Sequence, residues 1–295
     1  MIRLASVPAL PDSPSYPDAG LDGIEAMAGP DNRAHAPAGT VGLRLTLPLC
    51  WREAWLGLPE AAQLMTRVPT RDEMVEHLAA GIDEARRLRV KYVAIRASHG
   101  TPEGILTGRH GYTDYDVLMA LAEWLFLAMG ERDQGFEVLF ENTWHAGLRW
   151  NEPKLAQQLL DKIRHPRVAF SLDVGAWLLV SGGTQTETAD LRRLKNFAKT
   201  LGPIAQRFRA LVMRRPANAP VASDLVKKVR ATEDPSEKLK IAAQYDAAVD
   251  AHQPWVSAQL KELVEIVQPA YVIHRLKGEG AKWAEMVRRQ DGLVT

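Results

Sequence analysis

Two short apolar runs, each ending in a carboxylate, constrain the fold of this chain more than any other feature. They read Phe-Glu-Val-Leu-Phe-Glu, ending at Glu141, and Arg-Val-Ala-Phe-Ser-Leu-Asp, ending at Asp173. Asn151 and Pro153 begin a helix between them, as an N-cap followed by a proline in the first turn. Parallel α/β proteins carry their ligand-binding groups at the C-terminal ends of such strands. We therefore expect both acids at one ligand-binding edge, with helix capping or pairing to arginines as the alternative.

The alternation of strand and helix extends along all 295 residues. Eight strands are predicted, at Ile2–Val7, Gly23–Met27, Val41–Leu47, Val90–Ala97, Phe136–Glu141, Arg167–Asp173, Phe208–Met213 and Ala270–Leu276. Five or six helices alternate with them. This pattern predicts one α/β domain over residues 1–295, a (β/α)₈ TIM barrel. An open doubly wound sheet is the alternative, but no Gly-x-Gly-x-x-Gly follows the first strand.

The connections between these strands differ in character. Four prolines between residues 8 and 17 make the first link irregular, so the first helices are expected to be shortened or missing. Thr70 and Glu73 form a capping-box signature, which predicts a helix immediately after Thr70. The preceding segment, Pro48–Pro69, is predicted to be a long loop of the kind that forms lids or binding surfaces. Its Trp51 and Trp55 are candidates to wall a ligand, or else part of the core.

Charge and cysteine content exclude several classes of protein. Lys and Arg (37) nearly balance Asp and Glu (36), so no overall field draws the chain to nucleic acid or to a membrane. The single cysteine, Cys50, cannot form an internal disulfide or a cysteine-based zinc site. No apolar run is long enough to span a bilayer or to act as a signal core, so we expect a cytoplasmic protein.

Charged residues recur at the predicted strand ends, where buried barrel strands should be apolar. An unpaired charge there costs several kcal/mol, so these groups must neutralise one another or meet a ligand. One interpretation is a ring of salt bridges that closes the barrel, and the other is a polar pocket at its C-terminal end. The seven residues are Glu25, Arg44, Arg96, Glu141, Asp173, Arg214 and Arg275.

These segments resemble the xylose-isomerase-like TIM barrels, a superfamily that includes sugar-phosphate isomerases and epimerases and the endonuclease-IV-type enzymes. The resemblance covers nearly the whole chain. Each motif is short, but their order and spacing agree with the family. The matching segments are Leu21–Met27, Val41–Trp55, Leu139–Trp144, Ser171–Gly175 and Pro269–Leu276.

The resemblance also implies a metal site, from which this sequence departs. The family usually holds a divalent metal with a glutamate and an aspartate at strands five and six, which Glu141 and Asp173 match. A histidine near strand seven and a glutamate at strand eight complete the family set, but Arg214 and Arg275 stand there. Arginine has no lone pair to give a metal, yet its charge can replace that of an ion. We therefore expect a degenerate site in which guanidinium groups act as counter-ions.

The favoured function is an isomerase, epimerase or lyase-like reaction on a small anionic or polyhydroxylated, sugar-like metabolite, without the usual divalent metal. Glu141 and Asp173 are the acid/base candidates. The candidate substrate-binding residues are Glu25, Arg44, Arg96, His99, Trp144, His145, Arg214 and Arg275.

Two alternatives remain open from the sequence alone. One is a metal-dependent isomerase or epimerase with altered ligands, for which His99 and His145 are the best substitutes. The other is a binding or partner subunit that kept the barrel and lost catalysis. His110 and His274 are also expected near the mouth of the barrel.

Overall fold

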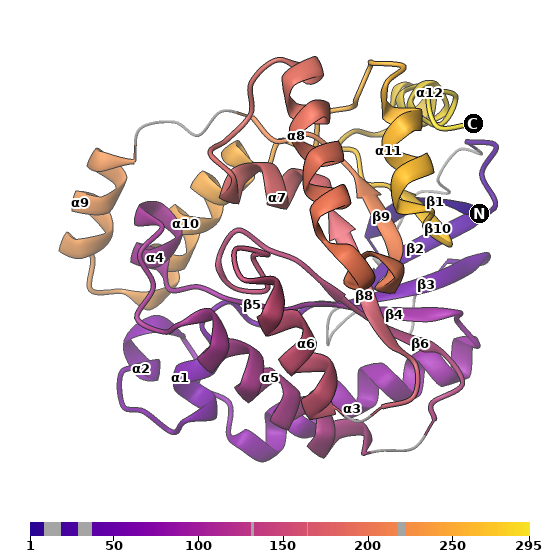
Figure 1. Cartoon of the computed structure of the whole chain (residues 1–295). Coiled ribbons are helices and arrows are strands. Elements are labelled where there is room, and N and C mark those ends of the chain that lie inside the picture. Colours follow the sequence, from indigo (N-terminus) through magenta and orange to yellow (C-terminus); the bar gives the residue numbers. More distant parts are fainter. Residues whose placement is uncertain (9–18, 29–36, 131–132, 164, 218–221) are drawn as a thin grey trace.

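The computed structural model describes residues 1–8, 19–28, 37–130, 133–163, 165–217 and 222–295. Its centre is a closed barrel of parallel strands in the order β1-β2-β3-β4-β6-β8-β9-β10 (Figure 1). The predicted (β/α)₈ barrel is therefore confirmed. The strands are β1 Ile2–Pro8, β2 Gly23–Ala28, β3 Thr40–Leu45, β4 Tyr92–Arg96, β6 Glu137–Glu141, β8 Val168–Asp173, β9 Phe208–Met213 and β10 Tyr271–His274. Two short antiparallel strands, β5 Ser98–His99 and β7 Ala146–Gly147, lie beyond the barrel.

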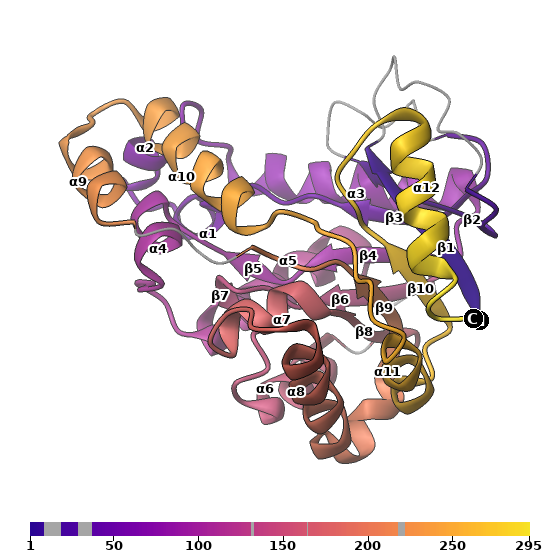
Figure 2. The same cartoon turned by 90° about the horizontal axis from the view of Figure 1, so that it is seen from above.

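Helices surround the barrel and also extend past its C-terminal end. The surrounding elements are α3 Arg71–Leu88, α5 Asp114–Met129, α6 Pro153–Ile163, α7 Val174–Val180, α8 Glu187–Thr200, η2 Gly202–Arg207, α11 Leu260–Val267 and α12 Gly280–Asp291. A second group lies on the C-terminal side of the strands (Figures 1 and 2): α1 Trp51–Trp55, α2 Ala61–Leu64, α4 Pro102–Thr107, α9 Ser223–Ala231 and α10 Pro235–Val249. No described helix is both long and apolar enough to cross a bilayer.

The connections test several predictions from the sequence. The capping box at the start of α3 is confirmed: Glu73 N donates to Thr70 Oγ1, and Thr70 N donates to the Glu73 carboxylate. The prediction of a long loop over Pro48–Pro69 is wrong, because α1 and α2 form within it. The expected missing helices concern residues 9–18 and 29–36, which lie outside the described residues.

Trp51 and Trp55 belong to the hydrophobic core instead of walling a ligand. Trp51 is fully buried, and its Nε1 donates to the carbonyl of Ser98. Trp55 stacks on Trp124 of α5, with ring centroids 5.7 Å apart. The two residues therefore fix α1 against α5, which explains why this segment is helical.

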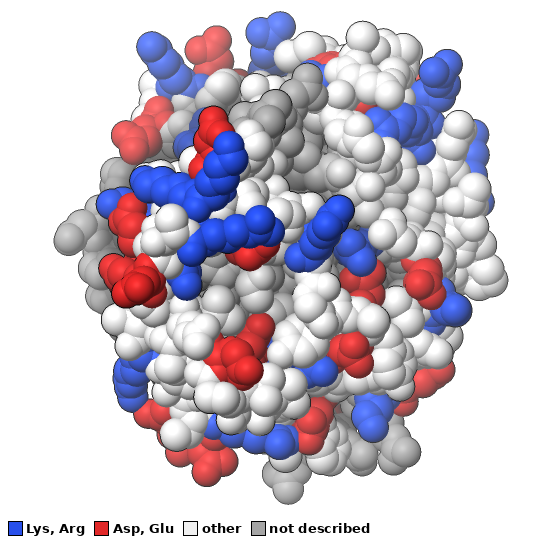
Figure 3. Space-filling view, turned by 90° about the vertical axis from the view of Figure 1, so that its left-hand side faces the viewer, with Lys and Arg blue, Asp and Glu red and all other residues white. Residues whose placement is uncertain are grey.

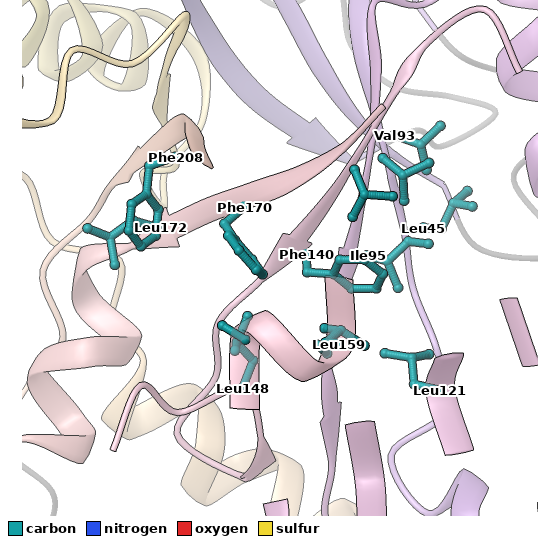
Figure 4. Packing of buried hydrophobic residues seen from close by; sticks show 14 of the residues in the cluster. Leu45, Val93, Ile95, Leu121, Phe140, Leu148, Leu159, Phe170, Leu172 and Phe208 are labelled. Carbon is teal, nitrogen blue, oxygen red and sulfur yellow. The ribbon is translucent and has the colours of Figure 1, made fainter. Parts of the chain in front are cut away.

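Alternation along the strands divides the buried residues between two layers. Outward side chains such as Val93, Ile95 and Phe140 pack against Leu121 of α5 and Leu159 of α6 in the main core (Figure 4). Because successive side chains on a strand point to opposite faces, the intervening residues point into the barrel. The interior cluster comprises Leu4, Tyr92, Ala94, Leu139, Ala169, Ala210, Val212, Tyr271 and Ile273.

One crowded point in this interior is Gly42 on β3. A Cβ at this position would lie 2.1 Å from Cζ of Tyr92, so the glycine leaves space for the phenol ring. Tyr92 is fully buried and fills the barrel beside it. The interior packing therefore depends on a residue without a side chain at position 42.

We predict that Gly42→Ala lowers the free energy of unfolding by about 1–3 kcal/mol, because overpacking displaces the Tyr92 ring. Urea unfolding measures the change. Gly111→Ala is the matched control, since no atom of a described residue lies within 4 Å of its added Cβ. Equal stability of the two variants would contradict this packing argument.

Candidate functional site

The C-terminal end of the barrel interior is occupied by charged side chains. Arg96, Glu141, Arg214 and Arg275 each follow an apolar interior residue by two positions, and Asp173 follows the interior residue Ala169 by four. This spacing places them on the inward face, one layer above the apolar cluster. Glu25 of β2 and Arg44 of β3 join the layer through ion pairs. The expected strand-end charges thus meet at one end of the barrel.

Arg275 lies at the centre of this layer and contacts three carboxylates. Its Nη2 donates to Glu141 Oε2 at 2.7 Å and to Glu25 Oε1 at 2.9 Å. Its Nη1 donates to Glu141 Oε1 at 3.0 Å and to Asp173 Oδ2 at 3.3 Å. The three acids come from β2, β6 and β8, so one guanidinium connects different sides of the barrel.

Glu141 is fully buried but remains ionised. Burial alone would raise its pKa, but the guanidinium groups of Arg275 and Arg44 outweigh burial and hold the pKa well below its usual range. Arg44 Nη2 donates to Glu141 Oε1 at 2.9 Å. A carboxylate with so low a pKa is a weak base, which affects its proposed role in proton transfer.

Asp173 uses each carboxylate oxygen differently. Oδ1 accepts the backbone N–H of Ala176 at 3.0 Å and so caps α7. Oδ2 accepts Arg214 Nε at 2.7 Å in addition to Arg275. The side chain of Asn142 fixes the position, because it donates to the Asp173 carbonyl and accepts from the Asp173 N–H.

Several residues that sequence reasoning missed complete the layer. Ser6 and the phenol of Tyr92 each donate to Glu25 at 3.0 Å. Asp250, at the end of α10, forms an ion pair with Arg214, and burial lowers the pKa of that arginine to about 10. Burial and the nearby Arg214 lower the pKa of His252 to about 2, so its imidazole is neutral.

Arg96 differs from the other arginines of the layer. Its guanidinium lies over the ring of Trp144, 4.5 Å from the centroid. The Nε and Nη2 atoms of Arg96 are buried and have no hydrogen-bond partner in the described part of the chain. Arg44 Nε and Arg275 Nε also lack a partner, but both of these guanidinium groups form ion pairs within the layer. Arg96 forms no ion pair with any described acid, so its donors and its charge remain available.

The predicted histidines do not converge on the carboxylates. His145 Nε2 lies 3.0 Å from Asp246 Oδ1 of α10, and burial lowers the pKa of His145. A neutral imidazole therefore donates from Nε2 to Asp246. His99 Nε2 lies 3.4 Å from Glu53 Oε2 of α1, and His110 packs at 6.2 Å from the ring of His145.

The placement of His274 at the mouth is wrong. It lies between the inward residues Ile273 and Arg275 in sequence, so its side chain points outward. There it contacts Asp291 Oδ1 at 3.1 Å and Gln290 Nε2 at 2.9 Å, both from α12.

Solved structures with the same architecture match nearly the whole chain. They include the 3-keto-D-glucoside 4-epimerase YcjR from E. coli (TM-score 0.54, 11% identity, 100% of this chain and 99% of that chain). A xylose isomerase domain protein from Planctomyces limnophilus also matches (TM-score 0.51, 12% identity, 99% and 95%). The chain has the fold of the xylose-isomerase-like TIM barrels. A third match is the probable 3-DHS dehydratase AsbF, involved in petrobactin synthesis, from Bacillus anthracis (TM-score 0.55, 11% identity, 99% and 98%). No protein-family model and no curated protein sequence matches the chain.

The residues present do not fit the divalent metal that the resemblance to this superfamily implies. A metal bound by Glu141 and Asp173 would need oxygen lone pairs that now accept hydrogen bonds from Arg44, Arg214, Arg275 and the start of α7. It would also lie beside guanidinium groups, which cannot act as ligands. Within the described part of the chain, no group of three or more His, Cys, Asp and Glu side chains is placed to hold a metal.

We predict that Arg275→Met destabilises the protein by about 3–5 kcal/mol at pH 7. It leaves the buried Glu25 without its counter-ion, and Glu141 and Asp173 each keep one guanidinium partner instead of two. The loss should shrink as the pH falls from 7 to 4. The reason is that the freed acids acquire raised pKa values and take up protons. In the wild type, Glu141 gives the opposite pH dependence. Its pKa is lower in the folded protein than in the unfolded chain, so the ionised side chain stabilises the fold above the unfolded pKa. This stabilisation is lost as the pH falls through the folded pKa.

Chemical unfolding at several pH values measures both curves. Arg230→Met, which removes an exposed pair with Glu103, is the control and should change stability little at any pH. Parallel pH profiles for the wild type and Arg275→Met would contradict the central role of Arg275.

Proposed function

We propose that the charged end of the barrel binds a small polar, anionic, sugar-like metabolite. We also propose that the protein acts on it as an isomerase, epimerase or lyase-like enzyme without a divalent metal. The observation that carries the proposal is the guanidinium of Arg96: among the described residues it pairs with no acid, and its buried Nε and Nη2 have no hydrogen-bond partner. The functional unit is taken to be the single barrel of residues 1–295.

The free donors of Arg96 favour an anion over a neutral ligand. A buried donor without a partner costs about 1–3 kcal/mol, which an accepting ligand recovers. Carboxylate and phosphate oxygens match the planar fork of a guanidinium. The ring of Trp144, against which Arg96 and Arg214 stack, holds both guanidinium groups in position at this site.

Buried groups, and not the general surface field, supply the proposed selectivity. Positive and negative side chains are interspersed on the face that includes the side of α4, α9 and α10 (Figure 3). Such a mixed surface gives weak steering of charged ligands. Selection among metabolites therefore falls to Arg96 and the charges around it.

The acid/base groups proposed for proton transfer lie in the charged layer or next to it, where the ligand would bind. Glu141 and Asp173 remain the candidates. Glu141 is an ionised acceptor whose basicity rises when a bound anion draws an arginine away from it. The neutral imidazole of His145, oriented by Asp246, is an additional acid/base group in the same region. The names of the matched epimerase and dehydratase agree with chemistry of this class, in which a proton moves next to a carbonyl.

The second candidate function is a binding or partner subunit without catalysis. The complete pairing of Glu141 and Asp173 with arginines favours it, because neither acid has a free oxygen in this arrangement. Turnover of a bound ligand distinguishes the two functions, since both require Arg96 for anion binding.

The metal-free proposal predicts that purified protein carries less than one equivalent of zinc, manganese or iron by elemental analysis. A chelator should leave the melting temperature unchanged, because no folding energy depends on a metal. One equivalent of tightly held metal that is lost in Glu141→Ala would favour the metal-dependent alternative instead.

The anion site predicts that phosphorylated or carboxylated sugars stabilise the protein more than their neutral counterparts in thermal-shift assays. Arg96→Ala should weaken binding of the anionic member of each pair about tenfold or more, because it removes one charge-assisted hydrogen-bonding group. Binding of the neutral member should change little.

Arg52→Ala is the matched control for Arg96→Ala. Arg52 also stacks on an aromatic ring, at 4.4 Å from the Tyr112 centroid. Its Nε and Nη1 are likewise buried and have no partner among the residues described. It lies on α1, outside the layer of paired charges. Equal losses in the two variants, or equal responses to neutral and anionic sugars, would contradict the anion site.

A further inference from the structure

A polar cavity lies at the opposite, N-terminal end of the barrel. Its volume is about 680 Å³, and the first residues of several strands line it. Glu137 begins β6, and Tyr271 begins β10. The cavity is thus separated from the charged layer of the mouth by the apolar interior cluster around Leu139 and Tyr92.

Positive side chains dominate the lining of this cavity. Among the residues that the structure describes, five cationic side chains line the cavity, from the end of α3, the end of η2 and the starts of the strands, against one carboxylate. The cations are Arg89, Lys91, Arg167, Arg207 and Arg209, and the acid is Glu137. The whole chain has a net charge of only +1, so this concentration is a local feature.

Pairing within the cavity leaves three of the cations uncompensated. Glu137 accepts Arg209 Nε at 2.7 Å and the Tyr271 hydroxyl at 3.1 Å. Arg167 pairs with Asp133 at 3.0 Å. Among the described residues, Arg89, Lys91 and Arg207 form no ion pair with any acid.

From this arrangement we infer a second binding site, at the N-terminal end of the barrel, for a phosphorylated small molecule. Several like charges around one cavity repel one another, and an anion of two or more charges removes that repulsion. Guanidinium and ammonium groups are also the side chains that bind phosphate oxygens best. The inference is independent of the function proposed for the mouth.

Hydrogen bonds among the other lining residues fix their positions around the three cations that form no ion pair. Arg209, Glu137 and Tyr271 are joined by hydrogen bonds, and burial and Glu137 raise the pKa of Tyr271 to about 12. The phenol therefore stays protonated and keeps its bond to Glu137 at neutral pH. Arg89 holds a left-handed conformation (φ 54°) at the end of α3, which turns the chain into β4.

Isothermal titration with inorganic pyrophosphate tests this site in the full chain. The triple variant Arg89→Gln, Lys91→Gln, Arg207→Gln should weaken pyrophosphate binding a hundredfold or more, since each cation that pairs with the anion strengthens binding about tenfold. The wild-type affinity should also fall as the salt concentration rises. Arg209 and Arg167 are unchanged in this variant, so their pairs with Glu137 and Asp133 remain.

We expect the triple variant to fold like the wild type, because the three substituted positions tolerate glutamine. Arg89, Lys91 and Arg207 are exposed, and Gln268 already adopts a left-handed conformation (φ 49°) at the end of α11. Glutamine is therefore compatible with the backbone at position 89. An unchanged melting temperature without ligand verifies this directly.

Two single variants separate this site from the mouth and from general charge effects. Lys227→Gln removes an exposed cation of α9, outside the cavity, and should leave pyrophosphate binding intact. Arg96→Ala should also leave it intact, whatever its effect on sugar ligands. Loss of pyrophosphate binding in Arg96→Ala but not in the triple variant would overturn the second site, as would absence of binding to the wild type.

Discussion

The contact of one guanidinium, Arg275, with three buried carboxylates is the interaction on which the charged layer depends. Each carboxylate would be costly to bury alone, and Arg275 connects acids from three different strands. The supporting groups serve the same arrangement: Tyr92 orients Glu25, and Gly42 leaves room for Tyr92. A packing change deep in the barrel is thereby linked to the charges at its mouth.

Strand periodicity explains how much of this arrangement the sequence could predict. Carboxylates and arginines at the ends of apolar runs are recognisable in the sequence, and barrel closure brings such ends together. The same periodicity, applied to β10, excludes His274 from the mouth, because its neighbours Ile273 and Arg275 point inward. A residue near the end of a strand belongs to the site only if its side chain lies on the inward face of that strand.

The contacts that α10 makes with residues of the barrel could not be predicted from the sequence. This helix belongs to a charged segment between β9 and β10, and nothing in its pattern shows which acids face the barrel. It packs with α9 and α4 through a small separate apolar cluster around Leu106 and Ile241. Asp246 and Asp250 then reach His145 and Arg214. Only the docked position of the helix decides that these two acids, among many on the segment, become the partners of buried side chains.

The strength of the ion pairs sets a condition on any catalysis at this site. As long as Arg44 and Arg275 hold Glu141, its pKa stays far below neutrality and it accepts a proton poorly. A ligand anion competes for the same guanidinium groups, and each hydrogen bond it takes from Glu141 raises the basicity of that acid. An uncharged ligand lacks this effect. Charge on the substrate would then do more than add affinity, because it would be what converts a structural carboxylate into a base.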